Sequence, residues 1–226
     1  MKRLLEESVV EGENSTHQGQ DIIKKQRRVN MPQHVDENGT PKYSAAQLAH
    51  IEPSAFTRSC FRAYGINTHA YEGGQLKDYF LETTEEHMEA YEIDVIQAIR
   101  DNDVDFLRAA KKAGRSLQGC NRFGESLIHL ACRRSSLEIV QFLVEEGSVS
   151  LRVKDDYGRT PLHDVCWRKE PDFALIDVIL NEEPDLLIIA DNRGHLPLDY
   201  ARKEHWGLWI RYLAVRMKKE VKRRLS

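Results

Sequence analysis

Gly158-Arg159-Thr160-Pro161-Leu162-His163 is the stretch of sequence that decides the fold, because related stretches stand before and after it. The earlier one is Gly124-Glu125-Ser126-Leu127-Ile128-His129, and the later one is Gly194-His195-Leu196-Pro197-Leu198-Asp199. The three glycines that open them are 34 and 36 residues apart. A repeat of about this length predicts a stack of small similar units instead of one globular core.

Other positions repeat in the same register. A side chain with an oxygen stands three residues before each glycine, as Asn121, Asp155 and Asp191. Each turn is followed by apolar residues with helical spacing, at 137–144, 173–180 and 209–213. The sequence therefore predicts consecutive units that each contain a turn and an apolar helix.

The stretch Thr160-Pro161-Leu162-His163 resembles the motif of the ankyrin repeat, a unit made of a turn and two antiparallel helices. The resemblance covers roughly residues 93–214, with one nearly complete motif and two degraded ones. An earlier unit at 93–114 has the apolar pattern without the motif, as expected of a terminal repeat that packs on one neighbour only. The resemblance implies an all-α fold, an ankyrin-type solenoid of stacked helix-turn-helix repeats. The polar N-terminal stretch adds a disordered N-terminal arm to this fold.

These patterns divide the chain into six segments. We expect a disordered arm at 1–43, short helices and a linker at 44–84, a degenerate N-terminal capping repeat at 85–119, ankyrin repeats at 120–154 and 155–190, and a C-terminal capping repeat with a basic terminal helix at 191–226. The arm is polar and has no sustained period. Its basic cluster at 24–28 suits nuclear import or nucleic-acid binding, although such clusters in polar tails are more often simply solvated.

Residues 54–64 have the pattern of a short helix with aromatic side chains on one side. We expect Phe56, Phe61 and Tyr64 to dock on the first repeat, whose apolar side has no upstream neighbour. The alternative is a linear motif that folds onto another protein. Further along, residues 83–86 have the spacing of a capping box, which predicts a helix that begins there and continues into the first repeat.

No set of residues has a catalytic or metal-binding pattern. His129 and His163 occupy the same position of two repeats, and the resemblance implies that they tie neighbouring turns together by hydrogen bonds. His129 and Cys132 would be a base and a thiol on one short helix, but we expect that helix to be packed. The cysteines show no metal-ligand spacing, and Cys132 and Cys166 fall about 8 to 10 Å apart in a stacked array, too far for a disulfide. We therefore expect no enzyme activity, no cofactor and no metal.

The composition, with 41% hydrophobic and 31% charged residues and a formal net charge of -3, is that of an ordinary soluble chain. The longest apolar run, at 186–190, is far too short to cross a membrane. The N-terminus turns acidic before the apolar region of a signal peptide can form. We expect an intracellular monomer, cytoplasmic or nuclear, with reduced cysteines.

In ankyrin repeats the partner-facing surface is the concave side, formed by the turn tips and the outer face of each first helix. Carried over by register, the partner-binding residues are Arg122, Phe123, Arg133, Arg134, Tyr157, Arg159, Trp167, Arg168, Arg193 and Lys203. This surface holds seven basic residues and three acidic ones, and its aromatic rings alternate with arginines. Aromatic and Arg side chains are enriched at energetically important interface positions. We therefore predict an adaptor or scaffold that binds another protein with an acidic segment.

Two other interpretations use the same residues. The charges can form a plain solvated face, with Phe123 and Tyr157 packed along the turn stems. Alternatively, the basic concave face and the stretch 211–224, with seven Lys or Arg against Glu220, suit a nucleic-acid-associated nuclear protein. Cations also suit a helix C-terminus and the polar outer face of a terminal repeat, which gives this stretch a structural explanation.

Overall fold

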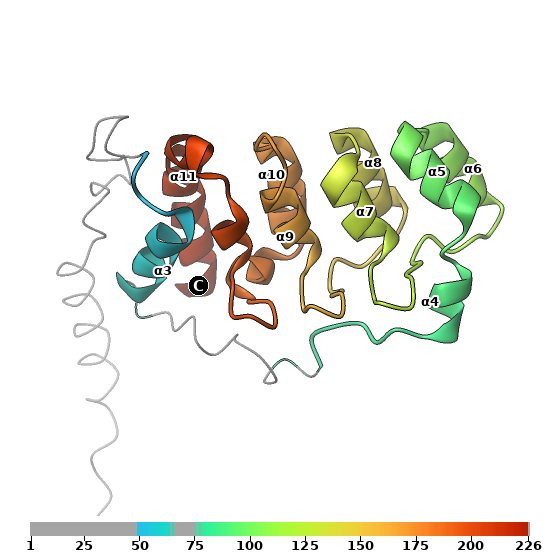
Figure 1. The fold of residues 1–226 in the computed structure, drawn as a ribbon, viewed down its shortest axis with the longest axis horizontal. Helices are drawn as coiled ribbons and strands as arrows, with labels where there is room; N and C mark the ends of the chain where they lie inside the picture. The colour runs from blue at the N-terminus through green and yellow to red at the C-terminus, as the bar shows by residue number, and fades with distance from the viewer. Residues whose placement is uncertain (1–48, 64, 66–75, 77, 226) are drawn as a thin grey trace, which may run out of the picture.

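A computed structural model describes residues 49–63, 65, 76 and 78–225 (Figure 1). The arm expected at 1–43, with its basic cluster, lies outside the described residues, and so does Tyr64. The described part of the chain is helical and contains no strand, only an isolated bridge between Cys120 and Ser126. The prediction of an all-α fold is confirmed.

Helical pairs stack side by side along the molecule (Figure 1). The first pair is α5 (Ile93–Asp101) with α6 (Val104–Lys112), and the second is α7 (Leu127–Arg134) with α8 (Leu137–Gln141) and the π-helix η2 (Phe142–Glu146). The third pair is α9 (Pro161–Cys166) with α10 (Phe173–Glu182), followed by the 3-10 helix η3 (Pro184–Ile188). The last unit has the 3-10 helices η4 (Pro197–Tyr200) and η5 (Lys203–His205) before α11 (Trp206–Leu225). One apolar core runs through the stack, which is the predicted solenoid.

The turn that opens a repeat is built in the same way three times. Oδ1 of Asn121 accepts the backbone N–H groups two and four residues later, at 2.9 and 3.1 Å, and Asp155 and Asp191 do the same. The chain then reverses at a glycine with φ of +73° to +81°, a conformation that glycine adopts without steric cost. We call these turns, residues 121–125, 155–159 and 191–195, the fingers.

His129 and His163 bond each finger to the next one. Nδ1 of His163 accepts the backbone N–H of Thr160 at 3.0 Å, so the ring proton is on Nε2 and is donated to the carbonyl of His195 at 3.2 Å. His129 makes the same bonds with Ser126 and Arg159, at 3.2 and 2.9 Å. Burial lowers the pKa of both rings, to about 4 for His163. The structural role implied by the resemblance is therefore confirmed.

The predicted docking of the N-terminal helix on the first repeat is wrong. α3 (Pro53–Ala63) buries Phe56 and Phe61, but it packs on α11 and η4 at the opposite end of the solenoid (Figure 1). The reason lies at both ends of the stack. Ile99 of the first repeat is already fully buried without α3. By contrast, α11 is 20 residues long, about twice the length of α6 or α10, and its extended apolar side includes the buried Met217 and Val221.

The segment of residues 78–84 runs along one edge of the solenoid toward the first repeat (Figure 1). We call this segment the strap. The backbone N–H of Leu81 donates to the carbonyl of Arg152 at 2.7 Å, and the hydroxyl of Tyr79 donates to Glu183 at 3.1 Å. The guanidinium of Arg152 lies 5.0 Å from the Tyr79 ring centre. The strap is thus fastened to the middle of the stack.

The helix after the strap, α4 (Glu85–Glu89), differs from the predicted one. Its N-cap is Thr84 instead of Thr83, and the reciprocal partner is His87 instead of Glu86, with both hydrogen bonds at 3.3 Å. The hydroxyl of Thr83 faces the thiol of Cys120 at 3.9 Å and so is not the cap. α4 also stops before α5 instead of continuing into it.

Candidate protein-binding surface

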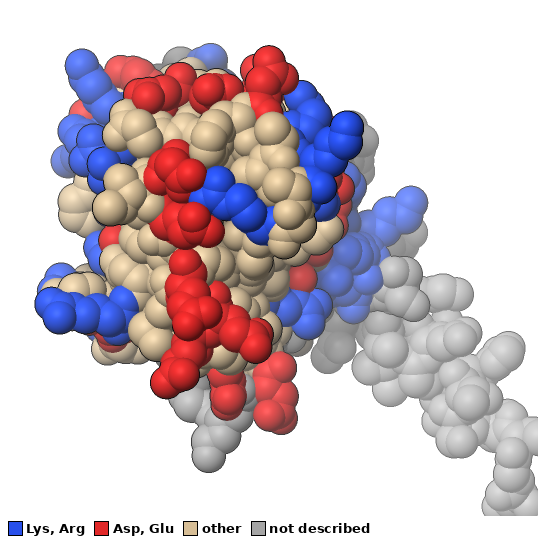
Figure 2. Space-filling model, turned by 90° about the vertical axis from the view of Figure 1, so that its right-hand side faces the viewer, with Lys and Arg blue, Asp and Glu red and all other residues tan. Residues whose placement is uncertain are grey.

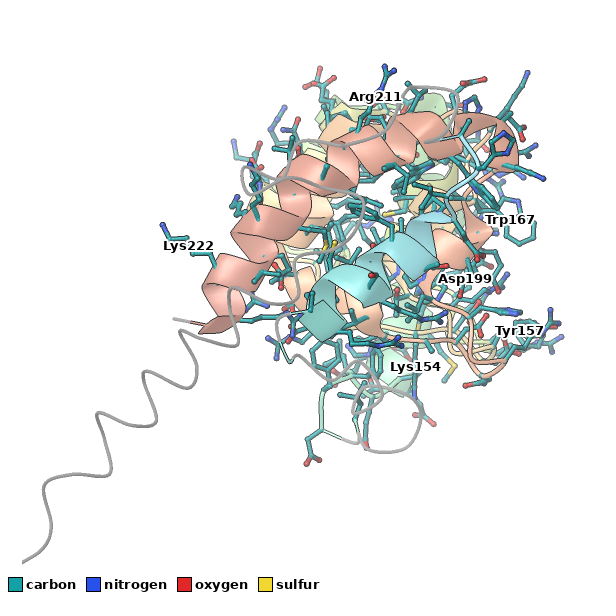
Figure 3. All side chains as sticks on the ribbon, turned by 90° about the vertical axis from the view of Figure 1, so that its left-hand side faces the viewer. Lys154, Tyr157, Trp167, Asp199, Arg211 and Lys222 are labelled. Carbon is teal, nitrogen blue, oxygen red and sulfur yellow. The ribbon has the colours of Figure 1, made fainter. Side chains whose placement is uncertain are left out.

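The structure separates the ten predicted partner-binding residues by exposure. Figure 3 shows Trp167 and Tyr157 projecting from the same side of the solenoid. The exposed residues are Arg122, Phe123, Arg134, Tyr157, Trp167, Arg193 and Lys203. The half-buried ones are Arg133, Arg159 and Arg168. Exposure alone thus leaves three aromatic rings and four cations free to meet a partner.

Trp167 is held in place from behind by a second ring. Trp167 is the C-cap residue of α9. The centre of its ring lies 5.3 Å from the centre of the Tyr200 ring, and the two ring planes are tilted by 32°. The Tyr200 hydroxyl donates to Asp191 of the third finger at 2.5 Å. Burial and this hydrogen bond raise the pKa of Tyr200 to about 12, so it stays a neutral donor. Even so supported, Trp167 remains 53% exposed.

Arg133, Arg159 and Arg168 have partners inside the molecule. Arg133 contacts Glu125 at 2.5 Å and Asp164 of the next repeat at 3.2 Å. Nε of Arg159 donates to Asp155 at 2.8 Å. Nη1 of Arg168 donates to the carbonyl of Ser135 at 3.1 Å, just past the end of α7. These three side chains join or brace repeats, a use that the sequence did not reveal.

Two carboxylates correct the charge count made from the sequence. Asp155 and Asp164 were left out of that count, yet both pair with arginines of this surface. Burial raises the pKa of Asp164, although Arg133 acts in the opposite direction. The surface is therefore less basic than predicted, and its cations without an ion pair among the described residues include Arg134 and Arg193.

The first finger also lines a groove on the surface of the protein. This groove of about 610 Å³ lies between the fingers and the strap, and Phe80, Leu81, Arg122, Phe123 and Lys154 are among its lining residues. Arg122 lies over the ring of Phe123, 4.7 Å from its centre. Sequence reasoning missed this groove because the strap is separated from the fingers along the chain, and no periodic signal connects them.

His129, Cys132 and Cys166, which carry the groups considered for catalysis, are buried. No group of three or more His, Cys, Asp or Glu side chains among the described residues is placed to hold a metal ion. Burial raises the pKa of the Cys132 and Cys166 thiols, which keeps them protonated. His129 is bonded through both ring nitrogens and is not free to act as a base. None of the helices in the described part of the chain combines the length and the hydropathy that a membrane span requires.

Charge is divided between the two ends of the solenoid. Figure 2 looks onto the end formed by the first repeat and shows a band of carboxylates there, and α4 at this end carries the exposed Glu85, Glu86 and Glu89. The opposite end has the basic helix α11. Part of its charge is used internally, because Arg216 contacts Asp177 at 3.0 Å and Arg224 contacts Glu220 at 2.7 Å.

Comparisons with known proteins agree with this geometry. A family model described as ankyrin repeats, in three copies, matches residues 95–180. The chain is 33% identical over 105 residues to protein phosphatase 1 regulatory subunit 27 of Mus musculus, a match that covers 45% of this chain and 64% of the mouse protein. It is 31% identical over 84 residues to the probable 26S proteasome regulatory subunit p28 of Saccharomyces cerevisiae, covering 37% of this chain and 36% of the yeast protein. The chain thus spans less than two thirds of either relative.

The repeated fingers, the histidine bonds and the family match lead to one conclusion. Residues 95–180 of this chain are ankyrin repeats, and these repeats form a protein-interaction module.

Proposed function

We propose that this protein is a non-catalytic adaptor or scaffold that binds another protein through the concave face, with Trp167 as the anchor. Both relatives are named as regulatory subunits, which supports a role in association rather than in catalysis. The single observation that carries the proposal is the half-exposed indole of Trp167 on its Tyr200 support.

The physical argument concerns preorganisation. Because Tyr200 limits the movement of Trp167, the indole loses little side-chain freedom when a partner covers it. An indole buries a large apolar area and keeps an N–H at its edge for a hydrogen bond. Arg134 and Arg193 lie on the repeats before and after that of Trp167. They supply a cationic rim, which favours a partner segment with carboxylates and speeds its approach.

Trp167→Ala tests the anchor. Immobilised wild-type protein captures partners from a cell extract, and mass spectrometry identifies them. We expect these partners to be lost with Trp167→Ala and kept with Leu208→Ala, a matched control that truncates a half-exposed side chain on α11. If the same proteins bind the Trp167→Ala variant and circular dichroism shows it folded, the proposal is wrong.

The rim is best tested at Arg134. Reversing Arg133 as well would place a third carboxylate beside Glu125 and Asp164 and would disturb the fold. Arg134→Glu should slow association with a captured partner and flatten its salt dependence, while dissociation changes little. An unchanged association rate would exclude the cationic rim.

Nucleic-acid binding stays the alternative prediction. It would show as binding to a generic duplex that weakens steeply with salt, because each phosphate contact releases counterions. A duplex that binds no better than an uncharged polymer would exclude it.

A further inference from the structure

The position of α3 is the feature that the proposed function does not explain. The first repeat is nearer to α3 along the chain, and Ile93 there is 85% exposed, but α3 does not cover it. α3 instead lies against α11 and η4, where the next repeat of a longer stack would be (Figure 3).

The contacts of α3 define what this end of the solenoid accepts. Phe56, Cys60 and Phe61 form its buried apolar side. The guanidinium of Arg224 lies 5.2 Å from the centre of the Phe61 ring. Arg58 contacts Asp199 of η4 at 3.5 Å. The surface made by η4 and α11 therefore takes an amphipathic helix with two aromatic side chains and one cation.

α3 does not fit this surface perfectly. The hydroxyls of Ser54 and Thr57, one helical turn apart, are fully buried and have no hydrogen-bond partner among the residues that the structure describes. A buried hydroxyl that has lost water and found no partner weakens the contact that buries it. α3 is also only 11 residues long, a length at which a helix is marginal without its packing. A helix with small apolar residues at these two positions would fit better.

We propose that the surface formed by η4 and α11, which we call the end site, binds an amphipathic helix of another protein and that α3 is an internal competitor for it. The partner helix has aromatic residues matching Phe56 and Phe61, small apolar residues matching Ser54 and Thr57, and a cation opposite Asp199. This proposal does not depend on the concave face. A tethered competitor acts at an effective concentration of the order of millimolar, so only a better-fitting helix displaces it.

The probe is a fluorescent peptide of residues 51–63 that carries Ser54→Ala and Thr57→Val. Its anisotropy is measured against the full chain and against a Phe56→Asp, Phe61→Asp double variant in which α3 is released. We expect the double variant to bind the peptide at least about tenfold more tightly than the wild type does. The peptide with the original Ser and Thr should bind about tenfold more weakly, because both hydroxyls lose water.

Ala55→Asp is the matched control, because it adds a carboxylate on the exposed side of the same helix. It should leave peptide binding at the wild-type level. A charge exchange identifies the site: Asp199→Lys in the double variant should weaken binding, and an Arg58→Glu peptide should restore it. Arg58→Glu in the full chain is a milder variant that should open the site if the double variant does not fold.

Several outcomes would overturn the proposal. One is equal binding to the wild type and to a folded double variant, which would place the peptide elsewhere. Another is no binding to either variant that releases α3. A wild-type dimer by light scattering, lost in the double variant, would mean that a second copy supplies the helix. Trp167→Ala should not change peptide binding, so the end site and the concave face are tested separately.

Discussion

Acid should destabilise this protein through His163, and His163→Gln should remove that effect. Folding lowers the pKa of this ring from 6.5 to about 4, because the ring is buried and its Nδ1 must stay unprotonated to accept the Thr160 N–H. Between these two values the unfolded chain binds a proton that the folded chain does not. The free energy of unfolding contributed by the neutral ring is therefore complete above pH 6.5 and is lost as the pH falls toward 4.

The size of the effect follows from the same two values. Going from pH 7 to pH 5, linkage gives a loss of about 2 kcal/mol from His163 alone. Glutamine does not titrate, so the variant should be less stable than wild type at pH 7 but should lose about 2 kcal/mol less over this interval. His129, which contributes in the same direction, and Asp164, which contributes in the opposite one, are present in both proteins and cancel in the comparison.

Urea unfolding followed by far-UV circular dichroism at both pH values measures these quantities. The difference between the two proteins in their pH 7 to pH 5 losses is the number of interest. If that difference is zero, His163 is not held neutral by the fold, and the explanation of the repeated histidine as a buried link between fingers fails.

Leu143→Ala should lower the free energy of unfolding by about 2 to 5 kcal/mol, because the side chain is fully buried. Leu208→Ala on the surface should lower it by under about 0.5 kcal/mol. Similar urea midpoints for the two variants would contradict the assigned core. Gly194→Ala should lower the free energy of unfolding by about 1 kcal/mol, because alanine disfavours the positive φ of this position. The added Cβ itself would meet open space. Gly158→Ala should cost about 1 to 3 kcal/mol more, because the added Cβ would lie 2.9 Å from the backbone nitrogen of Asn192. Thermal unfolding that ranks the two glycine variants in the opposite order would refute the close approach of neighbouring fingers.

Much of the fold was predictable because its determinants are local and periodic. The side chains of Asn121, Asp155 and Asp191 accept hydrogen bonds from backbone groups two and four residues ahead. The glycines adopt the positive φ that their own turns require. Once one unit is recognised, the period carries the same geometry along the chain. The candidate site was partly predictable for the same reason, since Trp167 and Arg133 occupy equivalent register positions.

The roles within the site needed the structure. Whether an arginine meets a partner or an internal carboxylate depends on the neighbouring repeat, and Arg133 reaches Asp164 there. Tyr200 was not among the predicted residues, although its ring, held by a hydrogen bond to Asp191, is what supports Trp167. The repeat pattern aligns such residues but does not say which side chains touch.

The sequence by itself thus determined the repeated unit and the exposed finger tips, because hydrogen bonds over a few residues specify them. Only the tertiary structure decided where α3 lies and which side of the stack the strap follows. The aromatic side of α3 had to be covered, as its sequence shows, but apolar burial has no direction and several apolar surfaces would satisfy it. The length of α11 and the position of Asp199 select one of them, and both act from the far end of the chain.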